Sequence, residues 1–300
     1  MESFTIRAMA KVNLGLDVIR RLENGYHQVK MIMQTVDLYD ELTFERTEGG
    51  IQLEVDQEVL PADESNLVWK AAKLLLEHFS PVGGVKIRLK KRIPMAAGMA
   101  GGSSDAAAVF HGLNRLFSLG MNTEDMRKLA VRIGADVPFC ITGGTMLSEG
   151  IGEILTPLPH VKSGFLVIAK PDISVSTKYV YEHLHVEKIK HHPDIANVER
   201  AIREENLEEM CACMENILET VTEKKYPVIS QIKSELKRKG ALTALMSGSG
   251  PSVFGIFRIK EQAMEACEAI RKKEFAKELF VTNFADRSCI FQDAFSDVRE

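Results

Sequence analysis

Residues 94–108 form a run of small side chains, P-M-A-A-G-M-A-G-G-S-S-D-A-A-A, which includes two adjacent hydroxyls and ends in an alanine tract. An alternating, strand-like stretch at 85–90 precedes the run, and the alanine tract favours a helix that continues through Leu116. Ser103 or Ser104 is placed to cap this helix. Residues 94–105 are called the slim loop below. The order of strand, slim loop and helix brings unpaired backbone N–H groups to the positive end of a helix dipole, which suits an anion such as phosphate.

The slim loop matches neither of the common nucleotide-binding patterns. No Gly-Lys-Ser/Thr closes it, as a Walker A loop requires, and it lacks the G-x-G-x-x-G of a dinucleotide site. A purely structural interpretation also exists, because small residues let a helix pack close to a sheet. The loop alone leaves phosphate binding and close packing as alternatives.

Strands and helices alternate along the chain in a way that predicts an α+β fold. The first 60 residues contain β-branched or alternating segments at 4–9, 13–18, 29–35 and 41–45. Helical patterns follow at 66–76, 123–133, 194–204, 206–219, 228–239 and 261–273, with short apolar strands at 164–169, 242–246, 252–257 and 278–283. Prolines within residues 155–159 interrupt both periodicities, so we predict an amino-terminal domain over 1–157 and a carboxy-terminal domain over 158–300.

Composition excludes several classes of function. The net charge is −4 and no long basic run occurs, so nothing favours nucleic-acid binding; the cations between Lys86 and Arg92 are interpreted as a solvated strand face. No apolar run can span a bilayer and no secretory pattern opens the chain, so we expect a cytoplasmic protein without a membrane partner. Five cysteines, an odd number, favour reduced thiols. The oligomeric state is not indicated.

Four segments, in order, resemble the motifs of the GHMP small-molecule kinases. They are A-K-V-N-L-G-L at 10–16, the slim loop at 94–105, G-A-D-V-P-F at 134–139 and S-G-S-G-P-S at 247–252. Because these motifs extend from residue 10 to residue 252, the resemblance covers nearly the whole chain. It implies an ATP-dependent kinase with a ribosomal-protein-like amino-terminal lobe, a smaller α+β carboxy-terminal lobe and substrates bound between the two.

The resemblance assigns the chemistry to Asp136 and Lys11. Asp136 lies at a turn before Pro138, where the residue type alone is equally compatible with capping. The resemblance implies that it is the general base for the acceptor hydroxyl. Lys11 interrupts an apolar, alternating stretch, and a lysine on the outer face of a strand is the alternative; the resemblance implies that it orients Asp136 and stabilises developing negative charge.

ATP and Mg²⁺ are the cofactors that the resemblance implies. Asn66 would contact adenine, with a helix-capping role as the alternative. Ser104 is the candidate Mg²⁺ ligand, and since no acidic partner is evident, the ion is expected to be held mostly by ATP phosphates and water. Alanine at 96, 97 and 100, where glycine is common in the family, leaves the loop conformation open. The predicted phosphate-binding residues are Pro94, Met95, Ala96, Ala97, Gly98, Met99, Ala100, Gly101, Gly102, Ser103 and Ser104.

Within the superfamily, N-G-Y-H at 24–27 and G-A-D-V-P at 134–138 are similar to one branch, whose acceptor is a methylerythritol linked to cytidine diphosphate. The resemblance implies that Tyr26 and His27 contact the cytidine base by stacking and by reading its edge. A tyrosine packed against its own hairpin is the alternative. Asn13, which shares a strand face with Lys11, would hold the erythritol end of this small-molecule substrate.

Two further segments complete the predicted acceptor site. Thr177 and Tyr181 lie four residues apart and could share one helix face; the resemblance makes them a second wall of the cytidine pocket, and a core-facing helix is the alternative. Gly248 and Ser249 would close the substrate side of the cleft, although a tight turn alone would also require glycine.

The predicted reaction is therefore phosphorylation of the 2-hydroxyl of the cytidine diphosphate-linked methylerythritol. Two alternatives remain: a sister kinase acting on homoserine, a mevalonate derivative or a sugar, and a non-catalytic nucleotide-binding relative.

Overall fold

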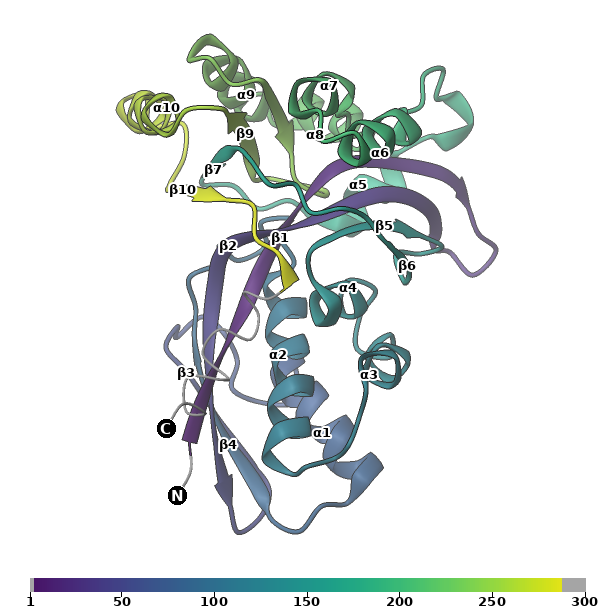
Figure 1. Ribbon diagram of the computed structural model, residues 1–300, viewed down its shortest axis with the longest axis vertical. Coiled ribbons are helices and arrows are strands. Elements are labelled where there is room, and N and C mark those ends of the chain that lie inside the picture. Colours follow the sequence, from purple (N-terminus) through teal and green to yellow (C-terminus); the bar gives the residue numbers. More distant parts are fainter. Residues whose placement is uncertain (1–2, 288–300) are drawn as a thin grey trace.

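A computed structural model describes residues 3–287, which form two α+β lobes stacked along the long axis of the molecule (Figure 1). The fold class predicted from the sequence is thereby confirmed. In the described part of the amino-terminal lobe, a six-stranded sheet contains β1 (Ser3–Arg21), β2 (His27–Thr47), β3 (Ile51–Val55), β4 (Gly84–Lys90), β5 (Thr145–Glu149) and β6 (Ile154–Pro157). Its helices are α1 (Leu67–Phe79), α2 (Gly101–Leu116), α3 (Thr123–Ala130) and α4 (Val137–Thr142).

The carboxy-terminal lobe has its own sheet of four described strands in the order β10-β7-β9-β8. These strands are β7 (Phe165–Lys170), β8 (Thr243–Met246), β9 (Val253–Phe257) and β10 (Glu278–Asn283). Its helices are α5 (Thr177–His183), the 3₁₀ helix η1 (Val186–Lys188), α6 (Ile195–Arg203), α7 (Leu207–Cys213), α8 (Glu219–Lys225), α9 (Val228–Arg238) and α10 (Lys260–Lys272). The end of the predicted second domain, 288–300, lies outside the described residues.

Two long strands replace the four short ones expected near the amino terminus. β1 and β2 pair in antiparallel register along their whole length, and the register shifts between Met9 and Lys11, Asn13 and Gly15, and Val18 and Arg20. Bulges of this kind insert a residue and turn a strand without ending it. The shift between Met9 and Lys11 falls between the predicted strands 4–9 and 13–18, where the break in the sequence pattern suggested a strand end.

The β1–β2 hairpin extends out of its own sheet and reaches the carboxy-terminal lobe (Figure 1). Leu16 bridges to Asn216, with backbone hydrogen bonds from Leu16 N to Glu215 O and from Ile217 N to Leu16 O, each 3.0 Å long. A Cβ on Gly15 would come within 2.8 Å of the Ile195 side chain of α6, so this contact is close. Because the hairpin joins both lobes, the boundary at 157/158 stays a prediction, although β6 does end at Pro157.

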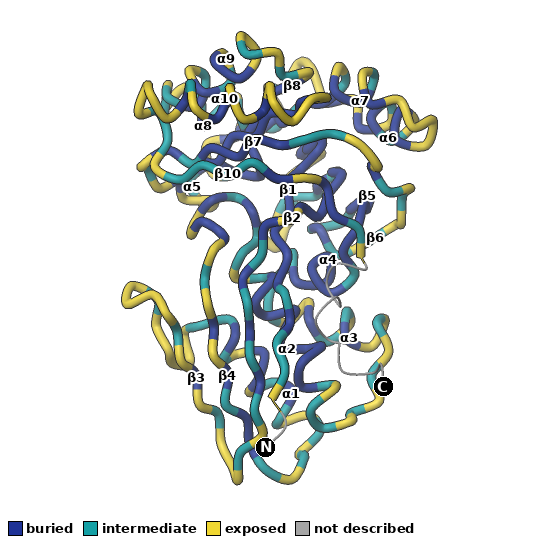
Figure 2. The backbone as a smooth tube through the Cα atoms, turned by 60° about the vertical axis from the view of Figure 1, so that its left-hand side comes forward, coloured by how far each residue is buried: buried dark blue, intermediate teal, exposed yellow. Residues whose placement is uncertain are grey.

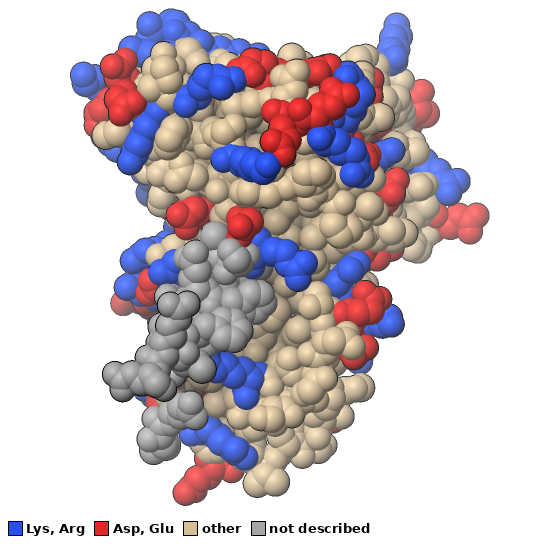
Figure 3. Space-filling view, in the orientation of Figure 1, with Lys and Arg blue, Asp and Glu red and all other residues tan. Residues whose placement is uncertain are grey.

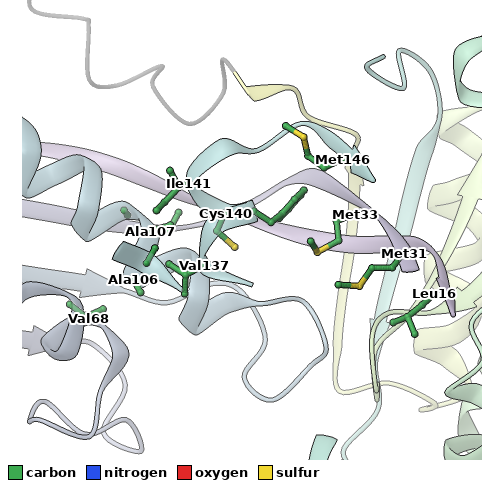
Figure 4. Close-up of a cluster of buried hydrophobic side chains, with 14 of the residues drawn as sticks. Leu16, Met31, Met33, Val68, Ala106, Ala107, Val137, Cys140, Ile141 and Met146 are labelled. Carbon is green, nitrogen blue, oxygen red and sulfur yellow. The ribbon is translucent and has the colours of Figure 1, made fainter. Parts of the chain in front are cut away.

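Helix α2 lies against the sheet of the amino-terminal lobe, and its small residues permit that closeness. A Cβ on Gly112 would meet the Phe44 ring of β2 at 2.5 Å. Figure 2 shows this helix buried between the sheet and the outer helices. In Figure 4, Ala106 and Ala107 of α2 share a cluster with Val137 and Cys140 of α4, which continues to methionines of β2.

The helix predicted at 206–219 is too long, because α7 ends at Cys213 and α8 begins only at Glu219. Met214 has extended backbone angles, φ −69° and ψ 122°, and ends α7. Asn216 follows, and its side chain donates to the carbonyls of Met246 and Gly248, both at 2.8 Å, while it accepts from Leu218 N at 3.0 Å. The helix stops here because these residues bind β1 and the 247–250 turn instead.

Charges of both signs intermingle on the face of the carboxy-terminal lobe that Figure 3 shows. In the part of the chain that the structure describes, no helix combines the length and the apolar character that crossing a bilayer requires.

Candidate active site

A cleft of about 890 Å³ is lined by β1, the β1–β2 turn, the slim loop and the start of α4, together with α5 and the 247–250 turn of the other lobe. It contains most of the site residues predicted from the sequence. Those that line it are Lys11, Asn13, Tyr26, His27, Asn66, Pro94, Met95, Ala96, Ala97, Gly98, Ala100, Gly101, Gly102, Ser103, Asp136, Thr177, Tyr181, Gly248 and Ser249. Met99 and Ser104 are not among the lining residues.

The slim loop takes a conformation in which small residues are required. Gly98 has φ +73°, and a Cβ there would lie 2.0 Å from the Ser247 carbonyl oxygen. The Ser247 hydroxyl donates to the Gly98 carbonyl at 2.9 Å, so the slim loop is fastened to the turn of the opposite lobe. Ala96 and Ala100 also have positive φ, 49° and 57°, in the region that glycine favours.

Helix α2 begins at Gly101, earlier than the sequence suggested, and the expected serine cap is wrong. Ala100 is the N-cap residue, and no side chain caps the helix. Ser103 and Ser104 lie inside the first turn, where Ser104 N already bonds to the Ala100 carbonyl at 2.8 Å. The open N–H groups of the first turn face the cleft without a side-chain acceptor, which is the arrangement that receives a phosphate.

Ser104 and Met99 point into the protein instead of the cleft. The Ser104 hydroxyl donates to the Met9 carbonyl and lies 3.4 Å from the Cys140 sulfur, and the residue is buried. This corrects the expectation that Ser104 offers its oxygen to Mg²⁺. Met99 is buried in the core, and its carbonyl accepts a hydrogen bond from Lys11 N at 3.2 Å, so it supports the loop from behind.

Lys11, Asn13 and Asp136 come together at one side of the cleft. The Lys11 ammonium donates to Asn13 Oδ1 at 2.7 Å and lies 3.8 Å from Asp136 Oδ2. Lys11 is almost completely buried, whereas the Asp136 side chain is about one-third exposed. A buried cation beside a carboxylate that reaches the cleft is a suitable pair for accepting a proton and stabilising the charge that forms.

Asp136 occupies the N-cap position of α4, and its backbone carbonyl accepts from Cys140 N at 3.1 Å. Its carboxylate makes no capping hydrogen bond. The two alternatives for this residue, helix cap and general base, are therefore compatible: its backbone begins α4, while its side chain makes no capping bond and lines the cleft.

Aromatic side chains form another part of the cleft lining, the aromatic wall. Tyr26, in the turn between β1 and β2, is 59% exposed, and Tyr181 of α5 packs on His27 with ring centroids 5.0 Å apart. Burial, and then the positive charge of Arg21, lower the pKa of His27 below 6.5. Burial, and then the Asp136 carboxylate, raise the pKa of Tyr181, so its hydroxyl stays protonated.

Helix α5 and the 247–250 turn meet across this end of the cleft. Thr177 and Tyr181 both line the cleft from one face of α5, as their spacing predicted. The hydroxyls of Thr177 and Ser249 are 2.8 Å apart and hydrogen-bonded. A Cβ on Gly248 would lie 3.1 Å from the Gly98 carbonyl, so the turn follows the slim loop closely.

Asn66 serves as the N-cap of α1, where its Oδ1 accepts from Val68 N at 2.9 Å and its amide nitrogen donates to the Pro61 carbonyl at 2.8 Å. The capping alternative is therefore observed. The residue also lines the cleft, so its contact with adenine stays a prediction.

The sequence did not single out a buried ionic network beneath the slim loop. Lys91 donates to Asp40 Oδ2 and, at 2.6 Å, to Asp105 Oδ2, and all three side chains are buried. Burial lowers the pKa of Lys91, but the two carboxylates outweigh it and raise that pKa; burial raises the pKa of Asp105. Lys86 and Lys90 form surface ion pairs, as a solvated strand face predicts. Lys91 follows Lys90 directly and so breaks the alternation, and this break was the sequence signal that Lys91 points inward.

Among the described residues, no group of three or more histidine, cysteine, aspartate or glutamate side chains could enclose a metal ion. Ser103 is the hydroxyl that lines the cleft at the start of α2. These residues fit a Mg²⁺ ion that keeps water and phosphate oxygens as most of its ligands.

Comparison with known proteins agrees with this geometry. Residues 66–144 match the family model "GHMP kinases N terminal domain", and residues 198–277 match "GHMP kinases C terminal". A 4-diphosphocytidyl-2-C-methyl-D-erythritol kinase of Acetivibrio thermocellus is 49% identical, covering 94% of this chain and 99% of that protein. The corresponding kinase of Lachnoclostridium phytofermentans is 47% identical, covering 95% and 98%.

Solved structures give the same result. A crystal structure of 4-(cytidine 5'-diphospho)-2C-methyl-D-erythritol kinase has 32% identity and a TM-score of 0.81, covering 94% of this chain and 99% of the other. A homoserine kinase from Cytophaga hutchinsonii, at 21% identity and a TM-score of 0.77, covers 96% of each chain and shares the fold. The chain belongs to the 4-diphosphocytidyl-2-C-methyl-D-erythritol kinase family of GHMP kinases.

Proposed function

We propose that the protein transfers the γ-phosphoryl group of ATP to the 2-hydroxyl of 4-diphosphocytidyl-2-C-methyl-D-erythritol. The observation that carries this proposal is the arrangement within one cleft: the slim loop, the Lys11–Asp136 pair and the aromatic wall of Tyr26, His27 and Tyr181. The slim loop matches the phosphates of ATP, the Lys11–Asp136 pair matches the reacting hydroxyl, and the aromatic wall matches the cytosine ring.

Asp136 accepts the proton of the 2-hydroxyl as its oxygen attacks the γ-phosphorus, and the bond to the β–γ bridging oxygen breaks to release ADP. Lys11 lies 3.8 Å from this carboxylate and 2.7 Å from Asn13 Oδ1, so it holds both side chains in place. Its positive charge stabilises negative charge on the attacking oxygen.

The open first turn of α2 and the backbone of the slim loop receive the ATP phosphates. The Ser103 hydroxyl, which lines the cleft at the start of α2, would contact a Mg²⁺ ion bound with ATP or the water shell of that ion, and the ion would supply positive charge to the phosphates. Asn66 contacts adenine through the part of its amide that the α1 cap leaves accessible.

The aromatic wall distinguishes this acceptor from smaller ones. Homoserine, mevalonate derivatives and galactose carry no base to stack on Tyr26, so an exposed aromatic side chain in the β1–β2 turn would serve no purpose for them. The neutral imidazole of His27, whose pKa is lowered, offers one donor and one acceptor to the cytosine edge.

Cytidine diphosphate as a competitive inhibitor tests the acceptor assignment. Tyr26→Ala should weaken its inhibition, since base–aromatic stacking contributes about 1–3 kcal/mol, or roughly 5- to 150-fold. Tyr26→Phe keeps the ring face and should change inhibition little, and the ATP affinity of both variants should match that of the unsubstituted protein. An unchanged inhibition constant in Tyr26→Ala would remove cytidine from this end of the cleft.

A further inference from the structure

A second cavity, of about 1330 Å³, lies in the carboxy-terminal lobe, separate from the catalytic cleft. Its walls come from α5, η1, the linker that follows, α7, α8, α9 and the start of β8. Helix α5 separates the two sites, because Thr177 and Tyr181 line the catalytic cleft while Tyr179 and His183 line the second cavity. The reaction described above makes no use of this space.

Five lysines around the second cavity form no salt bridge with any described carboxylate. Three elements and a linker supply them: η1, the residues after it, α8 and α9. They are Lys188, Lys190, Lys224, Lys225 and Lys237. All five are exposed, and the Lys225 ammonium lies 3.4 Å from the centre of the Tyr179 ring. Ammonium groups of this kind bind phosphate oxygens as point charges.

The acidic groups of the second cavity are already engaged. Lys233 donates to Glu219 and, at 2.5 Å, to Glu223, and the two carboxylates raise the pKa of Lys233 against the opposing effect of burial. The remaining carboxylate, on Glu215, accepts from His191 at 2.8 Å. The charges left without a partner are therefore positive, and they favour an anion.

Apolar side chains make up much of the remaining wall. The partly exposed ones are Ile189 of the linker after η1, Val221 of α8 and Leu242 before β8, and they are backed by the buried side chains of Leu184, Met214 and Ile217. An inorganic ion would leave this surface unused. A ligand with both a phosphate group and an apolar body would satisfy the lysines and cover the apolar wall.

We propose that the second cavity binds an organic phosphate or diphosphate that carries an apolar group. The phosphate lies among the five lysines and the apolar group lies against the wall formed by α8 and the linker after η1.

An occupant of the second cavity would touch residues that hold the catalytic turn. Asn216 lines the cavity and donates to the Gly248 carbonyl, and Glu219 accepts from Met246 N at 2.6 Å. Both bonds fix the 247–250 turn, which lines the acceptor end of the catalytic cleft. The ligand should therefore change the KM for the acceptor more than the KM for ATP.

Calorimetry on the full chain tests the binding directly. The catalytic cleft is first saturated with cytidine diphosphate and a non-hydrolysable ATP analogue, and pentyl diphosphate, inorganic diphosphate and 1-pentanol are then titrated separately. We expect one site per chain for pentyl diphosphate, at least tenfold tighter than inorganic diphosphate, and no measurable binding of 1-pentanol. Equal affinities for the two diphosphates would overturn the proposed role of the apolar wall.

A matched pair of variants locates the site. Lys188→Gln/Lys224→Gln/Lys237→Gln removes one cation from each of three elements around the second cavity and should weaken pentyl diphosphate at least tenfold. Lys128→Gln/Lys260→Gln/Lys272→Gln removes the same charge from α3 and α10, outside the cavity, and should leave the affinity unchanged. Equal losses in both variants, or binding that the cleft ligands abolish, would overturn the proposal.

Discussion

At the scale of single residues, the proposed chemistry depends on a lysine and an aspartate that two distant segments bring together. Lys11 is placed by a bulged strand and Asp136 by the start of a short helix, and the two charged groups are 3.8 Å apart. Lys11 is buried on the inner face of the β1–β2 hairpin, so the alternative of a solvated lysine is wrong.

Asp136→Asn should lower kcat by roughly 10²- to 10⁴-fold while ATP affinity stays nearly normal, since only the base is lost. Lys11→Met should also act mainly on kcat. Because the two groups form one pair, the double variant should lose less than the product of the single losses. Steady-state kinetics measure this, and strictly multiplicative losses would mean that the residues act independently.

Gly101→Val should weaken ATP binding at least tenfold, measured by calorimetry. A Cβ at this position would already lie 3.1 Å from Ile93 Cγ2 and 3.4 Å from Lys91 Nζ, so the larger valine side chain would displace the first turn of α2 and its open N–H groups. Gly49→Val is the matched control, because no atom lies within 4 Å of a Cβ there. Normal ATP affinity in Gly101→Val would mean that the small residues of the slim loop serve the packing of α2 against the sheet and not phosphate binding.

At the scale of elements, the slim loop is held from two sides. The Ser247 hydroxyl fixes Gly98 from the carboxy-terminal lobe, and the network of Lys91, Asp40 and Asp105 lies below the first turn of α2. Asp40 also accepts from the backbone N–H groups of Arg92 and Ile93, which lead into the loop. The network thus connects the end of β4, the sheet and α2.

Lys91→Met should destabilise the protein by about 3–5 kcal/mol, because two buried carboxylates lose their cation. Burial already raises the pKa of Asp105 in the folded state, and loss of the Lys91 cation raises it further, so the folded state binds more protons than the unfolded chain and stability falls as the pH rises. The loss should therefore be smaller at pH 5 than at pH 7. Lys90→Met, whose side chain is 57% exposed, should change stability by less than about 0.5 kcal/mol in the same urea titrations. Similar losses for both variants would contradict this account.

The elements that were predicted well are those with local signals. The apolar pattern at 278–283 and the alternation at 85–90 correspond to β10 and β4, and a strand, a slim loop and α2 follow in the expected order. The sequence predictions are wrong where tertiary contacts determine the local structure. Bulges join the early strands, the helix predicted at 206–219 ends at Cys213 before the contacts of Asn216, and Ser104 turns its hydroxyl to Met9 instead of capping a helix. None of these contacts has a counterpart in nearby sequence.

At the scale of the whole molecule, the β1–β2 hairpin connects the parts of the cleft to which the proposed function assigns the acceptor. It begins in the amino-terminal sheet, carries Lys11 and Asn13 past the slim loop, and ends against Asn216 of the other lobe with Tyr26 and His27 at its turn. Under the proposed function, the acceptor would lie along this pair of strands, which would hold the cytidine end and the reacting hydroxyl in fixed relation.

Release of ADP, measured with four acceptors under the same conditions, tests the central claim most directly. The acceptors are 4-diphosphocytidyl-2-C-methyl-D-erythritol, homoserine, mevalonate phosphate and galactose. The predicted result is ATP-dependent turnover with the cytidine-linked acceptor at a kcat/KM at least 10³-fold above the other three, together with loss of that turnover in Asp136→Asn. Faster turnover of homoserine, mevalonate phosphate or galactose, or no turnover of any acceptor by a protein that binds ATP, would contradict the proposed function.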